Sequence, residues 1–147
     1  MKKSVFGLIT VVLVVGLWSC GKVDKMICWR GDKEIPADGG TVVWKPVIDD
    51  TRLIPTFVAG YLEFYDSNDD WSTVTLDIDS LKIEKAGYEK IQGEWYEVVA
   101  SMNAVSITLS SNDTPFKRGI VIDIDDGQGK GGQAVMASQS PESWNQE

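Results

Sequence analysis

The feature that most restricts how this chain can fold is an alternation of apolar and polar residues with a period of two, repeated in short runs. The clearest runs lie at residues 71–79, 105–109 and 120–125. In the first run, Val74, Leu76 and Ile78 share one side and the residues between them are Thr or Asp. Each run predicts a strand with one buried and one solvated face. This parity predicts buried side chains at Leu76, Ile107 and Ile122, and exposed ones at Thr75, Thr108 and Asp123.

The segments between these runs are rich in Gly, Asp, Asn and Pro, which favour tight or left-handed backbone. They lie at residues 37–40, 66–70, 112–115 and 126–132. Residues 81–92 fit either a hairpin or an irregular crossover. Short strands separated by such turns predict an all-β fold, an antiparallel β-sandwich of about seven to nine strands. We expect the sandwich over residues 26–139, followed by a flexible tail at 140–147.

The N-terminus has the pattern of an export signal. Lys2 and Lys3 precede an apolar run that is shorter than the roughly 20 residues of a membrane-spanning helix. The run ends in Leu17-Trp18-Ser19-Cys20, which resembles the lipobox of bacterial lipoproteins. We therefore expect a lipoprotein signal peptide at residues 1–19, a lipidated Cys20, and a tether at 20–25. This predicts an outer-membrane location, on the cell surface or on the periplasmic face. The alternative is an ordinary secretory peptide.

Charge and composition exclude several functions. The chain has 14 basic and 22 acidic residues, a net charge of −8 that disfavours binding to nucleic acid. It contains no histidine, the commonest general base and metal ligand, so neither an enzyme nor a cofactor is expected. If Cys20 carries lipid, Cys28 has no disulfide partner in the chain. Because Cys28 stands between Ile27 and Trp29, we expect it to be buried.

Several short motifs after residue 35 form a recognisable series. They are residues 35–43, Asn68-Asp-Asp-Trp71, Trp95, residues 106–112, residues 118–123 and Gln139. This series resembles BACON-type domains, which are immunoglobulin-like sandwiches common in exported Bacteroidetes proteins. The chain departs from that pattern by a longer stretch before Trp71 and by the additional residues 81–92. The resemblance implies an immunoglobulin-like sandwich, a core position for Trp95, and carbohydrate binding or a spacer role.

One predicted hairpin brings aromatic residues together. If residues 56–65 pair with 71–79 across the short loop between them, Tyr65 lies opposite Trp71. Tyr61 then shares their face of the sheet, and all three rings point away from the core. Flat exposed rings are what the apolar face of a sugar stacks upon, so Tyr61, Tyr65 and Trp71 are the candidate ligand-binding residues. The alternative is a cross-strand pair that only holds the hairpin, or that another segment covers.

The loop of this hairpin is also a candidate metal site. Asp66, Asn68 and Asp70 place oxygen-bearing side chains at alternate positions, as at the start of an EF-hand loop. However, Trp71 stands where such a loop needs glycine, and Asp77 stands where it needs a bidentate Glu. Asp and Asn are common in hairpin turns for backbone reasons alone, so no metal is expected.

These observations favour a non-enzymatic cell-envelope lipoprotein that binds carbohydrate or acts as a spacer. Its expected partners are the membrane, through Cys20, and a glycan or an outer-membrane protein. The alternative is a structural or assembly subunit of a surface complex or fibre. A long uncharged sheet edge would favour assembly, whereas an exposed aromatic strip would favour a glycan. A hydrolase is the least favoured reading, since it would need a cleft with convergent carboxylates.

Overall fold

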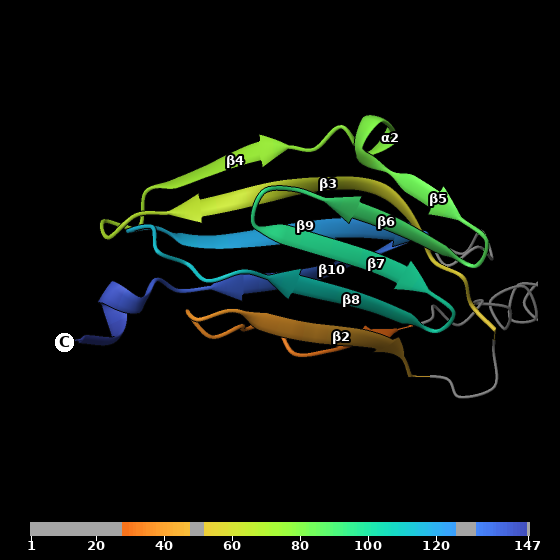
Figure 1. Ribbon diagram of the computed structural model, residues 1–147, viewed down its shortest axis with the longest axis horizontal. Coiled ribbons are helices and arrows are strands. Elements are labelled where there is room, and N and C mark those ends of the chain that lie inside the picture. The colour runs from red at the N-terminus through yellow and green to blue at the C-terminus, as the bar shows by residue number, and fades with distance from the viewer. Residues whose placement is uncertain (1–27, 48–51, 126–131, 147) are drawn as a thin grey trace, which may run out of the picture.

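The computed structural model describes residues 28–47, 52–125 and 132–146, and these form a β-sandwich of ten strands in two antiparallel sheets (Figure 1). The six-stranded sheet consists of β1 (Trp29–Arg30), β2 (Gly40–Pro46), β8 (Ala104–Leu109), β7 (Tyr96–Ser101), β6 (Tyr88–Gln92) and β5 (Ile83–Lys85), in that order. The four-stranded sheet consists of β10 (Gly132–Gln139), β9 (Lys117–Asp125), β3 (Thr56–Tyr65) and β4 (Trp71–Thr75). The predicted all-β antiparallel sandwich is confirmed, with more strands than the predicted seven to nine.

The described residues include a four-residue helix, α2 (Ile78–Leu81), and a short 3-10 helix, η1 (Glu142–Gln146). Within those described segments, no helix has the length and apolar character needed to cross a membrane. The predicted signal peptide, the lipidation site Cys20 and the tether at 20–25 lie outside the described residues.

The core lies between the two sheets and follows the predicted parity. Ile107 and Ile122 are fully buried, and Asp123 is exposed. Trp44 and Val42 also point inward from β2. Two expectations are corrected: Leu76 and Thr108 are both half-buried. Cys28, expected to be buried, is exposed, because its neighbour Trp29 takes the inward position.

The alternation at residues 71–79 predicted a single strand, but the structure does not form one there. β4 ends at Thr75, and Asp77 caps α2 with its carboxylate: Oδ1 accepts the Ser80 N–H at 3.4 Å and Oδ2 accepts the Ser80 hydroxyl at 2.7 Å. Ile78 is buried, but it is buried as a helix residue. Val74, which was expected to be buried, is 51% exposed because β4 is an edge strand whose five residues are all exposed.

The region at residues 81–92 takes the hairpin form rather than the crossover. β5 and β6 pair antiparallel, with Lys85 opposite Tyr88. Gly87 between them has a φ of 87°, a left-handed conformation that glycine adopts without steric cost. Ala86 and Gly87 therefore form the turn that reverses the direction of the chain between β5 and β6.

A β-bulge at Val58 fixes which side of β3 faces the core. Phe57 points inward, Val58 and Ala59 are both exposed, and the inward side then continues at Gly60 and Leu62. The Phe57 N–H donates to Oε2 of Glu89, which reaches across from β6, at 2.8 Å. At Gly60 a Cβ would lie 2.6 Å from Cδ1 of Ile122, so a larger residue there would require the Ile122 side chain to move.

The two edges of the four-stranded sheet differ. Residues 33–35, here called the strap, run parallel to β10: the Ile35 N–H donates to the Ser138 carbonyl at 2.9 Å, and the Ser138 N–H donates to the Lys33 carbonyl at 2.6 Å. Further along β10, the Gln133 side chain accepts from the Trp29 N–H and donates to the Trp29 carbonyl. The other edge, β4, has no strand partner beyond β3 in the described part of the chain.

A buried polar cluster ties Pro36, the residue that follows the strap, to both sheets. Arg118 donates from Nε to Oε1 of Gln139 at 3.0 Å, and from Nη2 to the carbonyls of Ser110 and Ser111 at 3.0 and 2.8 Å. Gln139 Nε2 in turn donates to the Pro36 carbonyl at 2.8 Å. Burial lowers the pKa of Arg118, an effect that the charge of Asp113 opposes. These side chains fix the end of the sandwich where the candidate site lies.

Trp95 packs against this cluster. Its ring lies 4.3 Å from the Arg118 guanidinium and makes edge-on contacts with Phe64 and Tyr96. The resemblance placed Trp95 in the core; the side chain is half-buried and packed against the core residues.

Candidate functional site

The β3–β4 hairpin has the register that the sequence predicts. Tyr65 lies opposite Trp71, Tyr61 opposite Thr75, and Leu62 opposite Val74. The same hairpin therefore carries the three candidate aromatic residues on the outer face of the four-stranded sheet.

At the tip of the hairpin, the candidate metal ligand Asp66 makes hydrogen bonds to the backbone of the turn. Oδ1 of Asp66 accepts the backbone N–H groups of Asn68 at 2.8 Å and Asp70 at 3.0 Å. Asp69 takes a left-handed φ of 59° between them. Asp66 thus serves the turn. Within the described segments, no group of three or more His, Cys, Asp or Glu side chains is arranged to hold a metal ion.

Tyr65 and Trp71 form a stacked pair. Their ring centroids are 6.4 Å apart and their planes differ by 24°. Trp71 is 60% exposed and Tyr65 is half-buried, so a broad indole face remains open to solvent. This geometry leaves a flat apolar platform at the edge of the sheet.

Tyr61 lies on the same face but in a different row of the sheet. It is in register with Val121 of β9, which is in register with Met136 of β10. Val121 is only 5% exposed although it points outward. The structure therefore brings Tyr65 and Trp71 together and places Tyr61 in an adjoining apolar row across the sheet.

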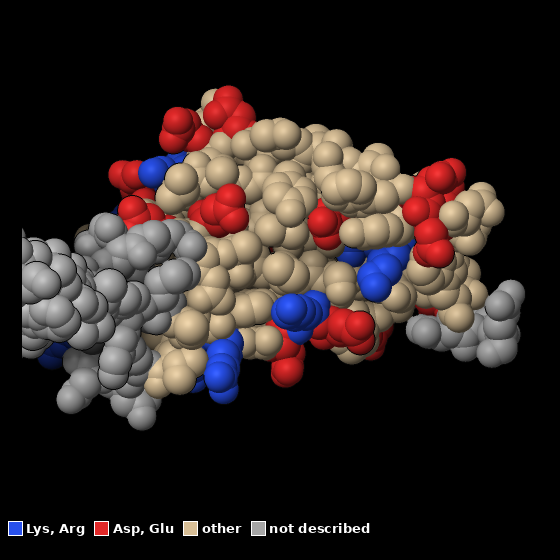
Figure 2. Space-filling view, turned by 180° about the vertical axis from the view of Figure 1, so that it is seen from behind, with Lys and Arg blue, Asp and Glu red and all other residues tan. Residues whose placement is uncertain are grey.

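A groove runs beside the Tyr65–Trp71 pair, and we call it the Tyr65 groove. Its volume is about 430 Å³, and it is lined by Lys33, Glu63, Tyr65, Asp69, Lys117, Met136, Ala137, Ser138 and Trp144. Figure 2 looks onto this side of the molecule, where uncharged side chains cover much of the surface between charged groups. The groove thus combines aromatic, acidic and basic side chains from the hairpin, the strap, β9, β10 and η1.

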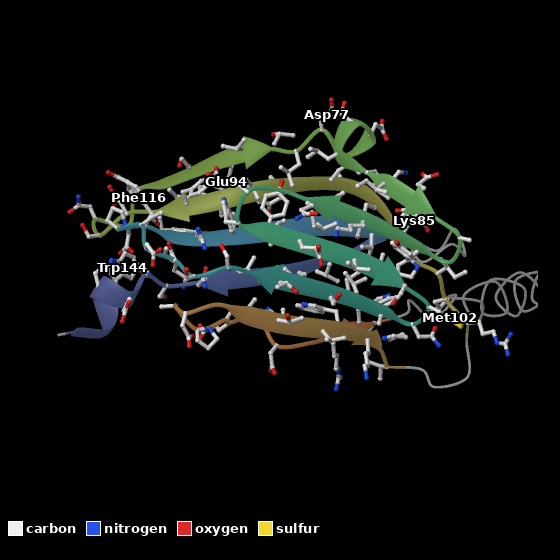
Figure 3. All side chains as sticks on the ribbon, viewed as in Figure 1. Asp77, Lys85, Glu94, Met102, Phe116 and Trp144 are labelled. Carbon is white, nitrogen blue, oxygen red and sulfur yellow. The ribbon has the colours of Figure 1, made fainter. Side chains whose placement is uncertain are left out.

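The sequence prediction missed Trp144. The segment expected to be a flexible tail contains η1, whose turn is closed by the Trp144 N–H donating to the Pro141 carbonyl at 3.2 Å. Pro141 is buried, and Trp144 lies at the same end of the sandwich as Phe116 (Figure 3). A tryptophan in an otherwise polar segment was the signal that this stretch contacts the domain.

The floor of the groove has a defined charge arrangement. Gly119 lies between Glu63 and Ser138 in the sheet, and the Glu63 carboxylate fills the space above it, with Oε2 3.4 Å from where a Cβ would stand. Burial raises the pKa of the Tyr65 hydroxyl most, and the charges of Glu63 and then Tyr61 raise it further. Tyr65 therefore stays a neutral hydrogen-bond donor at physiological pH. Lys117, in register with Tyr65, supplies an ammonium group.

No protein-family model matches this chain, and no curated protein matches it. Among solved structures, the chain is similar to an NMR structure of a protein from Bacteroides thetaiotaomicron, with 14% sequence identity and a TM-score of 0.47. The similarity covers 82% of this chain and 93% of that chain. At this level the likeness carries no argument, and the resemblance to BACON-type domains stays a prediction.

Proposed function

We propose that this protein is a cell-envelope lipoprotein whose β-sandwich binds carbohydrate, without catalysis, in the Tyr65 groove. The observation that carries the proposal is the stacked Tyr65–Trp71 pair at the side of a groove that Trp144 also lines. A sandwich that served only as a spacer would not need exposed aromatic rings beside a polar groove.

The chemistry of the groove suits a saccharide. A pyranose has an apolar C–H face that covers an aromatic ring, and hydroxyl groups that exchange hydrogen bonds with polar side chains. The ring of Trp144 and the side chain of Met136 supply apolar surfaces in the groove, and the exposed indole of Trp71, which stacks on Tyr65, extends them at its side. Glu63 and Asp69 supply acceptors, and Lys117 and the Tyr65 hydroxyl supply donors. The groove thus offers both kinds of contact within one site.

We assign no catalytic step to the groove. Its carboxylates, Glu63 and Asp69, come from the sheet face and from the hairpin turn. Glycoside hydrolysis needs two carboxyl groups on opposite sides of one bond, and one of them must be held protonated by its surroundings. Recognition by stacking and hydrogen bonding needs neither condition.

The binding test uses the purified protein on a glycan array, followed by calorimetric titration with the best ligand. Trp71→Ala and Trp144→Ala should each weaken binding roughly two- to tenfold, the scale of one aromatic contact of ~0.5–1.5 kcal/mol. Trp71→Ala should change the free energy of unfolding by about 1 kcal/mol or less, the scale of one cross-strand pair.

Phe116→Ala is the matched control. Phe116 is an exposed aromatic residue at the same end of the sandwich, and like Trp71 it lines the hollow beside β4, but the ring that stacks on Tyr65 of the groove is that of Trp71. Its replacement should leave glycan affinity unchanged. An array without any bound glycan, or equal losses in the Trp71 and Phe116 variants, would contradict the proposed site.

The anchoring part of the proposal rests on Cys20 and its surrounding sequence. Stable attachment needs acyl chains on that sulfur, so Cys20→Ala should release the protein from the membrane fraction or leave it uncleaved at this position. Fractionation with a carbonate wash measures this. A variant that remains in the membrane and lacks only the acyl groups would show that residues 5–18 are themselves the anchor.

The open edge of β4 favours the second candidate, an assembly subunit of a surface complex or fibre. The edge is formed by backbone groups and the groove by side chains of the sheet face, and Trp71 lies beside both. Replacing Trp144 tests the groove alone, and a change to the backbone of Thr73 tests the edge alone.

A further inference from the structure

The β4 strand exposes backbone groups along its outer edge. The Asp66 N–H donates to the Asp70 carbonyl at 3.1 Å, and the Leu76 N–H donates to the Gly60 carbonyl at 2.9 Å. Antiparallel pairing alternates along a strand, so residues 70, 72, 74 and 76 direct their backbone groups to β3. The N–H and C=O groups of Trp71, Thr73 and Thr75 therefore point away from the sheet, where the described chain provides no strand partner.

The edge lacks the features that usually block strand addition. Its sequence, Trp-Ser-Thr-Val-Thr, contains no charged residue and no proline, and all five residues are exposed. By contrast, β5, the edge strand of the other sheet, has three residues, of which Glu84 and Lys85 are charged. β4 is thus the open edge of this sandwich.

An apolar hollow lies at one end of that edge. Its volume is about 430 Å³, and it is lined by Phe64, Asp66, Asp70, Trp71, Ser72 and Phe116. Phe116 is 44% exposed. Val74 lies two residues after Ser72 on the same face of β4, and it is 51% exposed. A strand added beside β4 would direct the side chain opposite Ser72 to this face. The hollow would receive that side chain.

Acidic residues flank the edge at both ends. Asp69 and Asp70 precede β4 and Asp77 and Asp79 follow it, and all four are exposed. In Figure 2, acidic groups lie at the upper left and at the right end of the molecule, and much of the surface between them is uncharged. An antiparallel second copy centred on Thr73 would place Asp69 opposite Asp77, so like charges would meet at both ends. The charges favour a basic partner over a second copy of this chain.

We propose that β4 accepts an extended segment of another polypeptide as an additional strand, and that this segment has an apolar side chain at its centre and Lys or Arg at its ends. Main-chain hydrogen bonds to Trp71, Thr73 and Thr75 supply the pairing, and the hollow beside Phe64 and Phe116 selects the apolar side chain. This interaction uses the β4 edge and the hollow rather than the Tyr65 groove, with Trp71 lying beside both.

The test is fluorescence anisotropy of a labelled heptapeptide, Val-Thr-Phe-Thr-Val between two terminal lysines, with the purified protein. Saturable binding is expected. The same peptide with glutamates at its ends should bind more weakly, and a version with N-methyl groups on alternate amides should not bind. Asp70→Asn with Asp79→Asn, one acidic residue from each end of the edge, should weaken binding of the lysine peptide roughly two- to tenfold, the scale of two exposed ion pairs. Equal affinity for the N-methylated peptide would overturn the proposal.

Thr73→Pro tests the edge from the protein side. It removes an N–H that points away from β3, so the hairpin should keep its pairing while peptide binding is lost. Thr73→Val, which keeps the N–H, is the matched control and should bind like the wild type. The proposal is overturned if Thr73→Pro still binds the peptide while its thermal melt is unchanged. It is also overturned if sedimentation shows a wild-type dimer that Thr73→Pro dissociates, since the occupant is then a second copy.

Discussion

The two edges of the four-stranded sheet are built in opposite ways. β10 is covered by the strap and by the contact of Gln133 with Trp29, whereas β4 ends the sheet with its backbone exposed. The covering segments come from a part of the chain about a hundred residues earlier, as the contact between Gln133 and Trp29 illustrates with a separation of 104 residues. The comparison shows that segments distant in sequence cover the β10 edge, whereas the β4 edge can still pair with a further strand.

The strongest way to break the closed side is Arg118→Met. It removes the donors to the Ser110 and Ser111 carbonyls and to Gln139 Oε1, and each acceptor left without its donor costs about 1–3 kcal/mol, so we expect a loss of about 3–5 kcal/mol. Denaturant unfolding should show this loss in the free energy of unfolding. Lys117→Met, at the outward-facing neighbour, is the control and should change stability by about 0.5 kcal/mol or less. Similar values for both variants would mean that the cluster does not secure this edge.

Amide hydrogen exchange measures the difference between the edges directly. The Ser138 N–H is bonded to the strap, and the Thr73 N–H points to solvent. Exchange at Ser138 should be about a hundredfold slower or more, since it requires opening of the structure. Comparable rates at the two positions would show that the strap opens freely.

The smallest contrast comes from matched valines, one in each edge strand. Val135 of β10 is fully buried, and Val74 of β4 is 51% exposed. Val135→Ala should cost about 1.5–3 kcal/mol, the scale of a buried aliphatic side chain, and Val74→Ala about 0.5 kcal/mol or less. Thermal melts of the two variants give the comparison. A large loss at Val74 would mean that this face of β4 is covered in solution.

Local patterns in the sequence were sufficient for part of the fold. The β3–β4 register followed from a turn-rich loop and two runs that flank it, because both the turn and the alternation act over a few residues. The same alternation failed after Thr75. Val74, Leu76 and Ile78 fit the pattern of a strand. However, the side chain of Asp77 caps the start of helix α2, and an alternation of apolar and polar residues does not reveal such a cap.

The missed parts of the site depend on contacts distant in sequence. Trp144 and Lys33 reach the Tyr65 groove only because the strap and η1 fold back next to β10. Val121 is buried on an outward face because Tyr61 and Met136 come from neighbouring strands. Strand parity gave the side on which each residue lies, but burial on that side depended on which segments cover it.

Because of the bulge at Val58, the number of residues between Phe57 and Tyr65 determines which face of β3 carries the candidate site. With unbroken alternation after Phe57, the side chains of Tyr61, Glu63 and Tyr65 would face the core and Leu62 would face solvent. The additional residue reverses that phase. Deleting one residue at the bulge leaves both faces of β3 as they are, because Val58 and Ala59 both lie outside. Deleting one residue between Tyr61 and Tyr65 would instead turn the tip of the strand over and take Tyr65 out of its groove.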